Sequence, residues 1–148
     1  FGWAHTRGDG FVYLPKEQVL ATGDAIANGP FNFMGDAHIA NWPKVAEAAV
    51  SRPVKHLLPG HGRPGGRQIA SGQAKFLREI YAGVQNLLKA GKSADDLQKM
   101  GMAKTLEAAV RFSPESLNWV GPNLGGQAVF VAEEIAQKKP HGEIDGGR

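Results

Sequence analysis

The spacing of the apolar residues changes near residue 66, and this change limits the folds that the chain can adopt. Before residue 66, short apolar runs are separated by Gly, Asp and Pro, a pattern typical of β-strands joined by tight turns. After it, apolar residues recur at intervals of three and four, a pattern typical of helices that bury one face. We therefore predict an α/β (α+β, layered) fold, with a mixed β-sheet, outer helices and a helical region over residues 67–148.

The first part of the chain contains four strand-like runs. Residues 11–15 (FVYLP) and residues 18–22 (QVLAT) flank a polar Lys-Glu pair and predict a hairpin. Residues 54–59 (VKHLLP) lie between turn residues and predict a further strand. A strand is also expected over residues 1–4 (FGWA), so the predicted order is three strands, a helix and a fourth strand.

Helices are predicted between these strands and throughout the second part. Residues 36–52 form one candidate helix, with Asp36 as a possible cap and with regular turns that begin at Pro43. In the second part, Gly91 ends a long helix and Ser93 caps the next one. The other predicted features are an apolar face made of Phe76, Leu77, Ile80, Val84, Leu87 and Leu88, a further helix start capped by Ser113 and followed by Pro114, a helix over 125–138, and a frayed polar tail over 140–148.

Three residues of metal-binding type stand at the ends of the apolar runs. His5 follows FGWA, Asp24 follows VLATG, and His61 follows HLLPG. Zinc and related metals readily take imidazole nitrogen and carboxylate oxygen as ligands, and a strand end holds such a side chain rigidly. For each residue taken alone, a role in a turn is the simpler interpretation. Their order and their flanking sequences together favour a shared metal site.

The ordered segments AHTRGD, VYLPKEQVLATGD and LLPGHG resemble the C-terminal half of the metallo-β-lactamase superfamily, whose fold is an αββα sandwich. The resemblance implies that His5 binds a first metal, that Asp24 bridges two metals and takes part in catalysis, and that His61 binds the second metal. It assigns residues 1–66 to the β-rich half of the domain that carries these motifs. Residues 67–148 match only in general character, as the helical region of the same domain.

The superfamily signature His-x-His-x-Asp-His, which carries the remaining ligands, does not occur in this sequence. The other histidines, His38, His56 and His141, are isolated and have no neighbour at metal-ligand spacing. We therefore expect the chain to be the C-terminal half of a longer protein whose upstream half holds the signature. We also expect the isolated chain to be inactive.

The resemblance implies a zinc-dependent hydrolase with two zinc ions in the full-length protein, or with iron or manganese instead. Such an enzyme uses a metal-bound hydroxide to hydrolyse a small-molecule ester, thioester, lactone, lactam, or phospho- or sulfo-ester. Two alternatives remain open: an iron-dependent redox member of the same fold, and a non-catalytic half-domain that self-associates. For the isolated chain, a form without metal also remains open, and the expected partner is the missing N-terminal half or a second copy of the chain.

Further candidates surround the predicted metal site. Asp9 is either an acceptor that orients His5 or a turn residue that accepts backbone N–H groups. For His38 a surface position is favoured over contact with substrate. For Arg63 a solvated position is favoured over contact with an anionic substrate. Residues 29–36 (GPFNFMGD) either line the mouth of an apolar pocket or pack on the core.

Charge and composition argue against several other functions. The net charge is +3 without any block of like charges, so we expect no nucleic-acid partner. No run approaches the ~20 apolar residues that span a membrane, so we expect no membrane partner. The sequence contains no cysteine, which excludes disulfides and thiolate metal sites. A periplasmic or secreted location and a cytoplasmic location both remain open.

Overall fold

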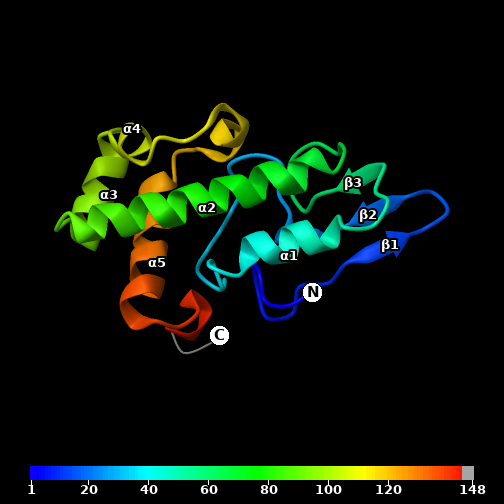
Figure 1. The fold of residues 1–148 in the computed structure, drawn as a ribbon, viewed down its shortest axis with the longest axis horizontal. Helices are drawn as coiled ribbons and strands as arrows, with labels where there is room; N and C mark the ends of the chain where they lie inside the picture. Colours follow the sequence, from blue (N-terminus) through cyan, green and yellow to red (C-terminus); the bar gives the residue numbers. More distant parts are fainter. Residues whose placement is uncertain (145–148) are drawn as a thin grey trace.

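A three-stranded mixed sheet lies at one end of the molecule, and helices build the rest (Figure 1). The computed structural model describes residues 1–144. Strand β1 (Val12–Leu14) pairs antiparallel with β2 (Val19–Ala21), which pairs in parallel with β3 (His56–Leu58). The predicted hairpin, the later strand and the mixed α/β class are confirmed.

The strand predicted over residues 1–4 does not form. Gly2 has a φ of 103°. The backbone N–H of Ala4 donates to a carboxylate oxygen of Asp9 at 3.1 Å, and the carbonyl of Ala4 accepts the N–H of His38 at 2.9 Å. Because these loop contacts use both backbone groups of Ala4, neither is left for a sheet ladder.

Two helices pack against one face of the sheet, and the longer of them reaches the opposite end of the molecule (Figure 1). Helix α1 (Trp42–Ala49) begins one residue before Pro43, as the sequence predicts. Asp36 lies outside α1 and does not cap it, so that prediction is wrong. Helix α2 (Gln68–Lys89) runs along most of the length of the molecule (Figure 1) and begins well before the apolar face predicted from residue 76.

The remaining helices gather at the end away from the sheet. Helix α3 (Ala94–Met102) starts at the predicted cap, because the N–H of Asp96 donates to Ser93 Oγ at 3.1 Å and the Asp96 carboxylate accepts the N–H of Ser93 at 2.9 Å. Helix α5 (Leu124–Gln137) matches the predicted helix closely. The predicted start at Ser113 and Pro114 is a 3-10 helix, Pro114–Trp119, and the Ser113 side chain makes no capping hydrogen bond to it. Helix α4 (Leu106–Val110) and the 3-10 turns at Gly23–Ala25 and His141–Glu143 were not predicted.

The chain end that was expected to fray is packed where the structure describes it. His141 is 1% exposed. Its Nδ1 atom lies 2.8 Å from the carbonyl of Gly35, its Nε2 atom lies 2.7 Å from the Glu133 carboxylate, and its ring packs on Phe130. The predicted fraying is therefore wrong over residues 140–144, and residues 145–148 lie outside the described part.

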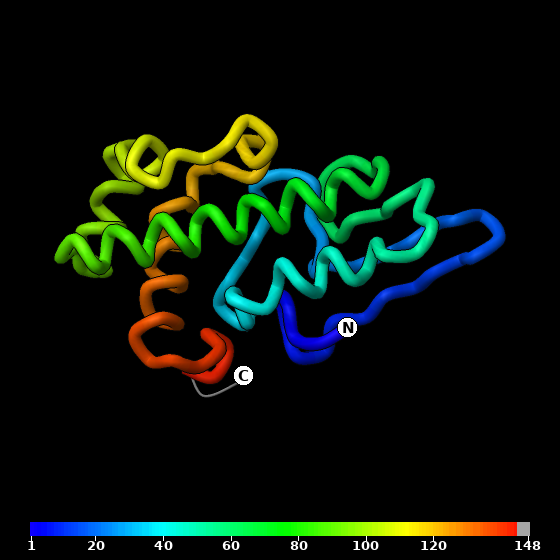
Figure 2. The backbone as a smooth tube through the Cα atoms, in the orientation of Figure 1, coloured from blue at the N-terminus to red at the C-terminus, as the bar shows by residue number. Residues whose placement is uncertain are grey.

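The two faces of the sheet differ in their environment. Leu20 and Leu57 are neighbours across β2 and β3, and both are fully buried with helix residues such as Trp42. On the opposite face, Val12 of β1 is 64% exposed and Leu58 of β3 is 41% exposed. The β1–β2 hairpin extends beyond the helices (Figure 2), so one apolar face of the sheet remains uncovered.

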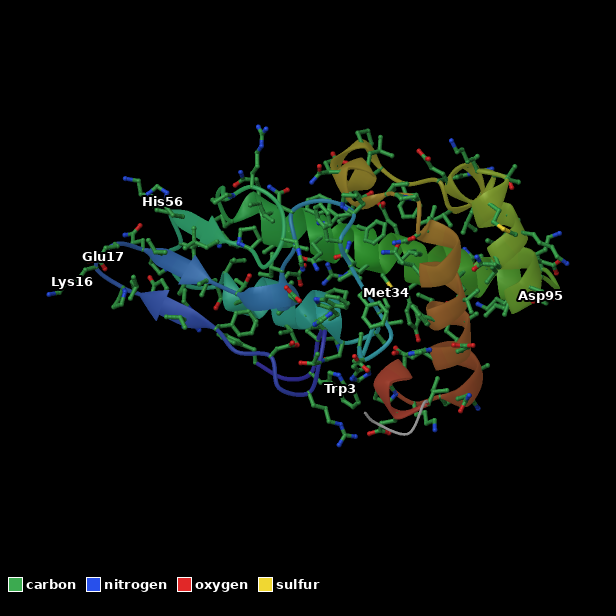
Figure 3. All side chains as sticks on the ribbon, turned by 180° about the vertical axis from the view of Figure 1, so that it is seen from behind. Trp3, Lys16, Glu17, Met34, His56 and Asp95 are labelled. Atoms are coloured by element: carbon green, nitrogen blue, oxygen red, sulfur yellow. The ribbon has the colours of Figure 1, made fainter. Side chains whose placement is uncertain are left out.

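The molecule is elongated, and its hairpin and helical ends are far apart. In Figure 3, Lys16 and Glu17 mark the tip of the hairpin, and Asp95 of α3 marks the other end. Across residues 1–144, no helix combines the length and the hydropathy that a membrane span requires.

Candidate metal centre

Asp24 and His61 lie side by side, beyond the ends of two neighbouring strands. Asp24 stands in the 3-10 turn that follows β2, and His61 stands in the loop that follows β3. Because β2 and β3 run parallel, their carboxyl ends meet at the same edge of the sheet. Nε2 of His61 lies 3.4 Å from Oδ1 of Asp24, and both side chains are about half exposed.

The loop of His61 packs tightly on the loop of Asp24. The N–H of Gly60 donates to the carbonyl of Gly23 at 2.9 Å. A Cβ atom on Gly60 would lie 2.5 Å from the carbonyl carbon of Gly23 and 2.7 Å from the nitrogen of Asp24, and it would overlap Oδ1 of Asp24. Only glycine fits at position 60, because any side chain would force the two loops apart.

Position 62, directly after His61, also requires glycine, for a separate reason. Gly62 has a φ of 86°, and a Cβ atom there would lie 2.8 Å from the carbonyl carbon of Asn28. The N–H of Asn28 donates to the carbonyl of His61 at 2.8 Å, and its side-chain amide donates to the carbonyl of Arg63 at 2.8 Å. These contacts tie the backbone at His61 and Arg63 to Asn28.

His5 is not grouped with this pair, and its ring lies near two aromatic side chains. The His5 ring centroid is 5.6 Å from that of Trp42 and 6.5 Å from that of Phe33. The Trp42 indole N–H donates to the carbonyl of Ala25 at 2.7 Å, so Trp42 links the surroundings of His5 to the turn that carries Asp24. Within residues 1–144, no three His, Cys, Asp or Glu side chains are grouped closely enough to hold one metal ion.

The three surrounding candidates occupy different positions. Asp9 accepts the backbone N–H groups of Ala4 and Thr6, which flank His5, and it therefore shapes the turn that carries this histidine. His38 is partly buried and lines a different hollow, next to Glu134. Arg63 is exposed, in the loop after His61.

The Asp24–His61 pair has the spacing of two ligands of one zinc ion. Zinc bonds of about 2.0–2.1 Å in a tetrahedral site place neighbouring ligand atoms roughly 3.3 Å apart. The observed separation is 3.4 Å, and one donor is a nitrogen and the other an oxygen. The same two atoms form an ion pair when His61 is protonated. The separation and the donor atoms of the pair therefore match two of the four ligands that a tetrahedral zinc site needs.

A hollow of about 490 Å³ opens beside His61. The loop with Phe31 and Phe33 forms one wall, and residues of α3 and of the start of α5 form the other. The ring of Phe31 stacks on that of His61 with 5.6 Å between centroids. Phe31, Phe33 and Met102 are 51%, 55% and 69% exposed, so the mouth of the hollow is apolar.

Three buried amide side chains, which the sequence analysis did not single out, lie at this hollow or next to it. Gln73 is fully buried, Asn32 is 3% exposed and Gln127 is 5% exposed. Gln73 stands on α2 between the apolar pairs Ile69–Ala70 and Phe76–Leu77. The position of Gln73 on an otherwise apolar helix face could have predicted that its side chain is buried and hydrogen-bonded.

The comparisons with known proteins found similar solved structures only. No protein-family model and no curated protein matches the sequence. The chain is similar to the crystal structure of VMB-1, with 29% identity and a TM-score of 0.46 over 49% of this chain and 36% of that chain. It is also similar to the DIM-1 metallo-β-lactamase exposed to ceftazidime, with 30% identity and a TM-score of 0.44 over 50% of this chain and 37% of that chain. The match spans little more than a third of the length of either structure.

Proposed function

We propose that this chain contributes Asp24 and His61 to the metal centre of a metal-dependent hydrolase. The single observation that carries the proposal is the 3.4 Å separation of Nε2 of His61 and Oδ1 of Asp24, on two glycine-bearing loops at one edge of the sheet. The resemblance of the three sequence motifs to metallo-β-lactamases supports the same conclusion. The proposed metal is zinc, two ions in the whole site, and iron or manganese are the alternatives.

The residues of this chain have defined tasks in such a centre. His61 offers a neutral imidazole nitrogen, and the contacts of its backbone with Asn28 fix its position. Asp24 offers a carboxylate that balances part of the metal charge and, with its two oxygens, can join two ions. Bound zinc would supply a Lewis acid and lower the pKa of a water molecule. His5 is the proposed further ligand, and the turn closed by Asp9 holds its backbone.

The remaining ligands are proposed to come from an N-terminal half of the same sandwich. The exposed apolar face of the sheet supports this, because a second sheet packed on it would remove Val12 and Leu58 from water. The proposed substrate is a small molecule with a hydrolysable ester, thioester, lactone, lactam, or phospho- or sulfo-ester bond. The hollow beside His61 would receive its apolar part.

The same sheet face favours a second candidate function for the chain by itself, a non-catalytic half-domain that self-associates. Val12, Leu14 and Leu58 are 64%, 47% and 41% exposed, and the register places Val12 and Leu58 on either side of Ala21 in one row across the sheet. Apolar residues grouped in this way on a sheet promote pairing with another copy.

Cobalt(II) titration followed by visible absorption tests the main proposal, because a cobalt ion bound by nitrogen and oxygen ligands reports its geometry in its spectrum. The wild-type chain is expected to develop an absorption band that zinc removes by competition. An Asp24→Asn variant should give a much weaker band, and an Asp36→Asn variant should match the wild type. Identical titrations for all three proteins would remove Asp24 from the metal centre.

A further inference from the structure

We propose that the hollow beside His61 binds a neutral ligand that combines a carboxamide group with an apolar body. This inference goes beyond the proposed function and concerns binding alone, so it applies to the chain with or without a metal. It rests on two buried polar atoms in residues that line the hollow. Asn32 Nδ2 and Gln127 Oε1 have no hydrogen-bond partner among the described residues.

Backbone groups fix the orientation of Asn32. The N–H of Ala27 donates to Gln73 Oε1 at 3.0 Å, so the Nε2 end of Gln73 must face away from Ala27. Nε2 of Gln73 then donates to Asn32 Oδ1 at 2.9 Å. The remaining atom of the Asn32 side chain is therefore a donor, Nδ2.

A second backbone group fixes the orientation of Gln127. Its Nε2 atom donates to the carbonyl of Asn32 at 2.8 Å, which leaves Oε1 as an acceptor. Two residues that line the hollow thus each have one unpaired atom buried beneath its surface, a donor on Asn32 and an acceptor on Gln127. Buried polar groups are nearly always hydrogen-bonded in native proteins, because leaving them unpaired is costly.

A carboxamide offers the complementary pair of groups. Its carbonyl accepts a hydrogen bond from a donor such as Asn32 Nδ2, and its N–H donates to an acceptor such as Gln127 Oε1. An anion satisfies only the donor, and an ammonium group satisfies only the acceptor. The lining residues also include no Asp, Glu, Lys or Arg, so the hollow favours a neutral polar group.

The apolar side chains that line the hollow favour a ligand whose remaining part is apolar. Phe31, Phe33, Met102 and Phe130 line it, so an aromatic or aliphatic body would gain from burial there. The two unpaired atoms have almost no exposed surface, so a carboxamide reaches them only when the side chains around them move. Met102, 69% exposed, lines the hollow and is the most exposed of its large apolar side chains.

Titrations monitored by two-dimensional NMR, in the presence of EDTA, test this inference with three probes that share a phenyl body. 2-Phenylacetamide carries both a donor and an acceptor, phenylacetone carries the acceptor alone, and phenylacetate is an anion. We expect the amide to bind about tenfold more tightly than the other two, because they leave Gln127 Oε1 unpaired. The shifted signals should include those of Asn32, Met102 and Gln127. Equal affinity for the amide and the ketone, no binding of the amide, or shifts elsewhere would overturn the inference.

Variants locate the binding site independently of the choice of probe. Met102→Glu places a charge at the mouth and should weaken binding of 2-phenylacetamide about tenfold. Leu117→Glu changes a similarly exposed apolar residue that does not line the hollow and should leave the affinity unchanged. Gln127→Met should reduce the preference for the amide over the ketone, with circular dichroism as a check of folding. If Met102→Glu and Leu117→Glu have the same effect, the ligand binds elsewhere and the inference is wrong.

Discussion

Gly60 and Asp24 pack so closely that a Cβ atom on Gly60 would lie 2.7 Å from the backbone nitrogen of Asp24. The glycine before His61 is therefore more than a turn residue. It lets the loop after β3 rest directly on the turn after β2, and this contact brings the imidazole of His61 to the carboxylate of Asp24.

Gly60→Ala tests this contact. The new methyl group would meet the backbone of Gly23 and Asp24, so we expect a loss of about 1–3 kcal/mol in the free energy of unfolding and a weaker metal centre. Urea denaturation and zinc titration measure the two effects. Gly10→Ala is the matched control, because no atom lies within 4 Å of a Cβ built there. Similar stability of both variants would contradict the packing described for Gly60.

Glu134 joins three segments in the interior of the molecule. It is 3% exposed and accepts the backbone N–H groups of Ile39 at 2.9 Å, Ala40 at 2.8 Å and His141 at 3.0 Å. Glu134→Ala leaves these N–H groups unpaired and should lower the free energy of unfolding by about 3 kcal/mol or more. Gln137→Ala, at an exposed position of the same helix, should change it by less than about 0.5 kcal/mol. Equal losses in urea denaturation would show that Glu134 does not join these segments.

Glu79 should contribute to the loss of stability in acid. Burial acts to raise the pKa of this carboxyl, but hydrogen bonds from Ser116 and Ser113 outweigh it and hold the pKa below its usual value of 4.5. A lowered pKa in the folded state means stability that is present above pH 4.5 and is lost as the pH falls through the folded pKa.

The measurement is the difference in free energy of unfolding between the wild type and Glu79→Gln, taken at several pH values. This difference should shrink as the pH falls from 7 to below 4.5, because the protonated glutamic acid resembles the glutamine. Glu107→Gln, at an exposed position on α4, provides the baseline. A constant difference for Glu79→Gln across this range would contradict the lowered pKa.

The exposed sheet face predicts self-association of the chain in solution. Sedimentation velocity of the wild type should show a species larger than a monomer whose fraction rises with concentration. A Val12→Lys and Leu14→Lys double variant should shift the chain to monomer, because a sheet-to-sheet contact would bury both charges. Leu117→Lys changes an exposed leucine outside the sheet and should keep the wild-type behaviour. A wild type that is monomeric at every concentration would argue against the self-associating half-domain.

Local signals in the sequence predicted several elements well. Ser93 and Asp96 stand three residues apart, and their reciprocal hydrogen bonds depend only on that spacing, so the start of α3 could be predicted. The hairpin of β1 and β2 likewise depends on two neighbouring runs. The strand predicted over residues 1–4 does not form. The N–H of His38, far along the chain, donates to the carbonyl of Ala4 that a strand would need for pairing.

The candidate site depends on contacts that spacing does not encode. The sequence motifs singled out Asp24 and His61, but only the parallel pairing of β2 with β3 brings them together. Residues of α3 and α5 form one wall of the hollow, and both helices lie far along the chain from the loop of Phe31. The burial of His141 was not predicted for a similar reason. Its polar flanking sequence does not indicate that its ring nitrogens pair with the carbonyl of Gly35 and the carboxylate of Glu133.

Zinc binding by isothermal titration calorimetry tests the central claim, that Asp24 and His61 hold a common metal ion, most directly. The wild-type chain should bind zinc, and His61→Ala should bind it at least about tenfold more weakly, because one of two ligands is lost. His56→Ala, at an exposed position on β3, should match the wild type. Equal zinc affinity for wild type and His61→Ala would contradict the account.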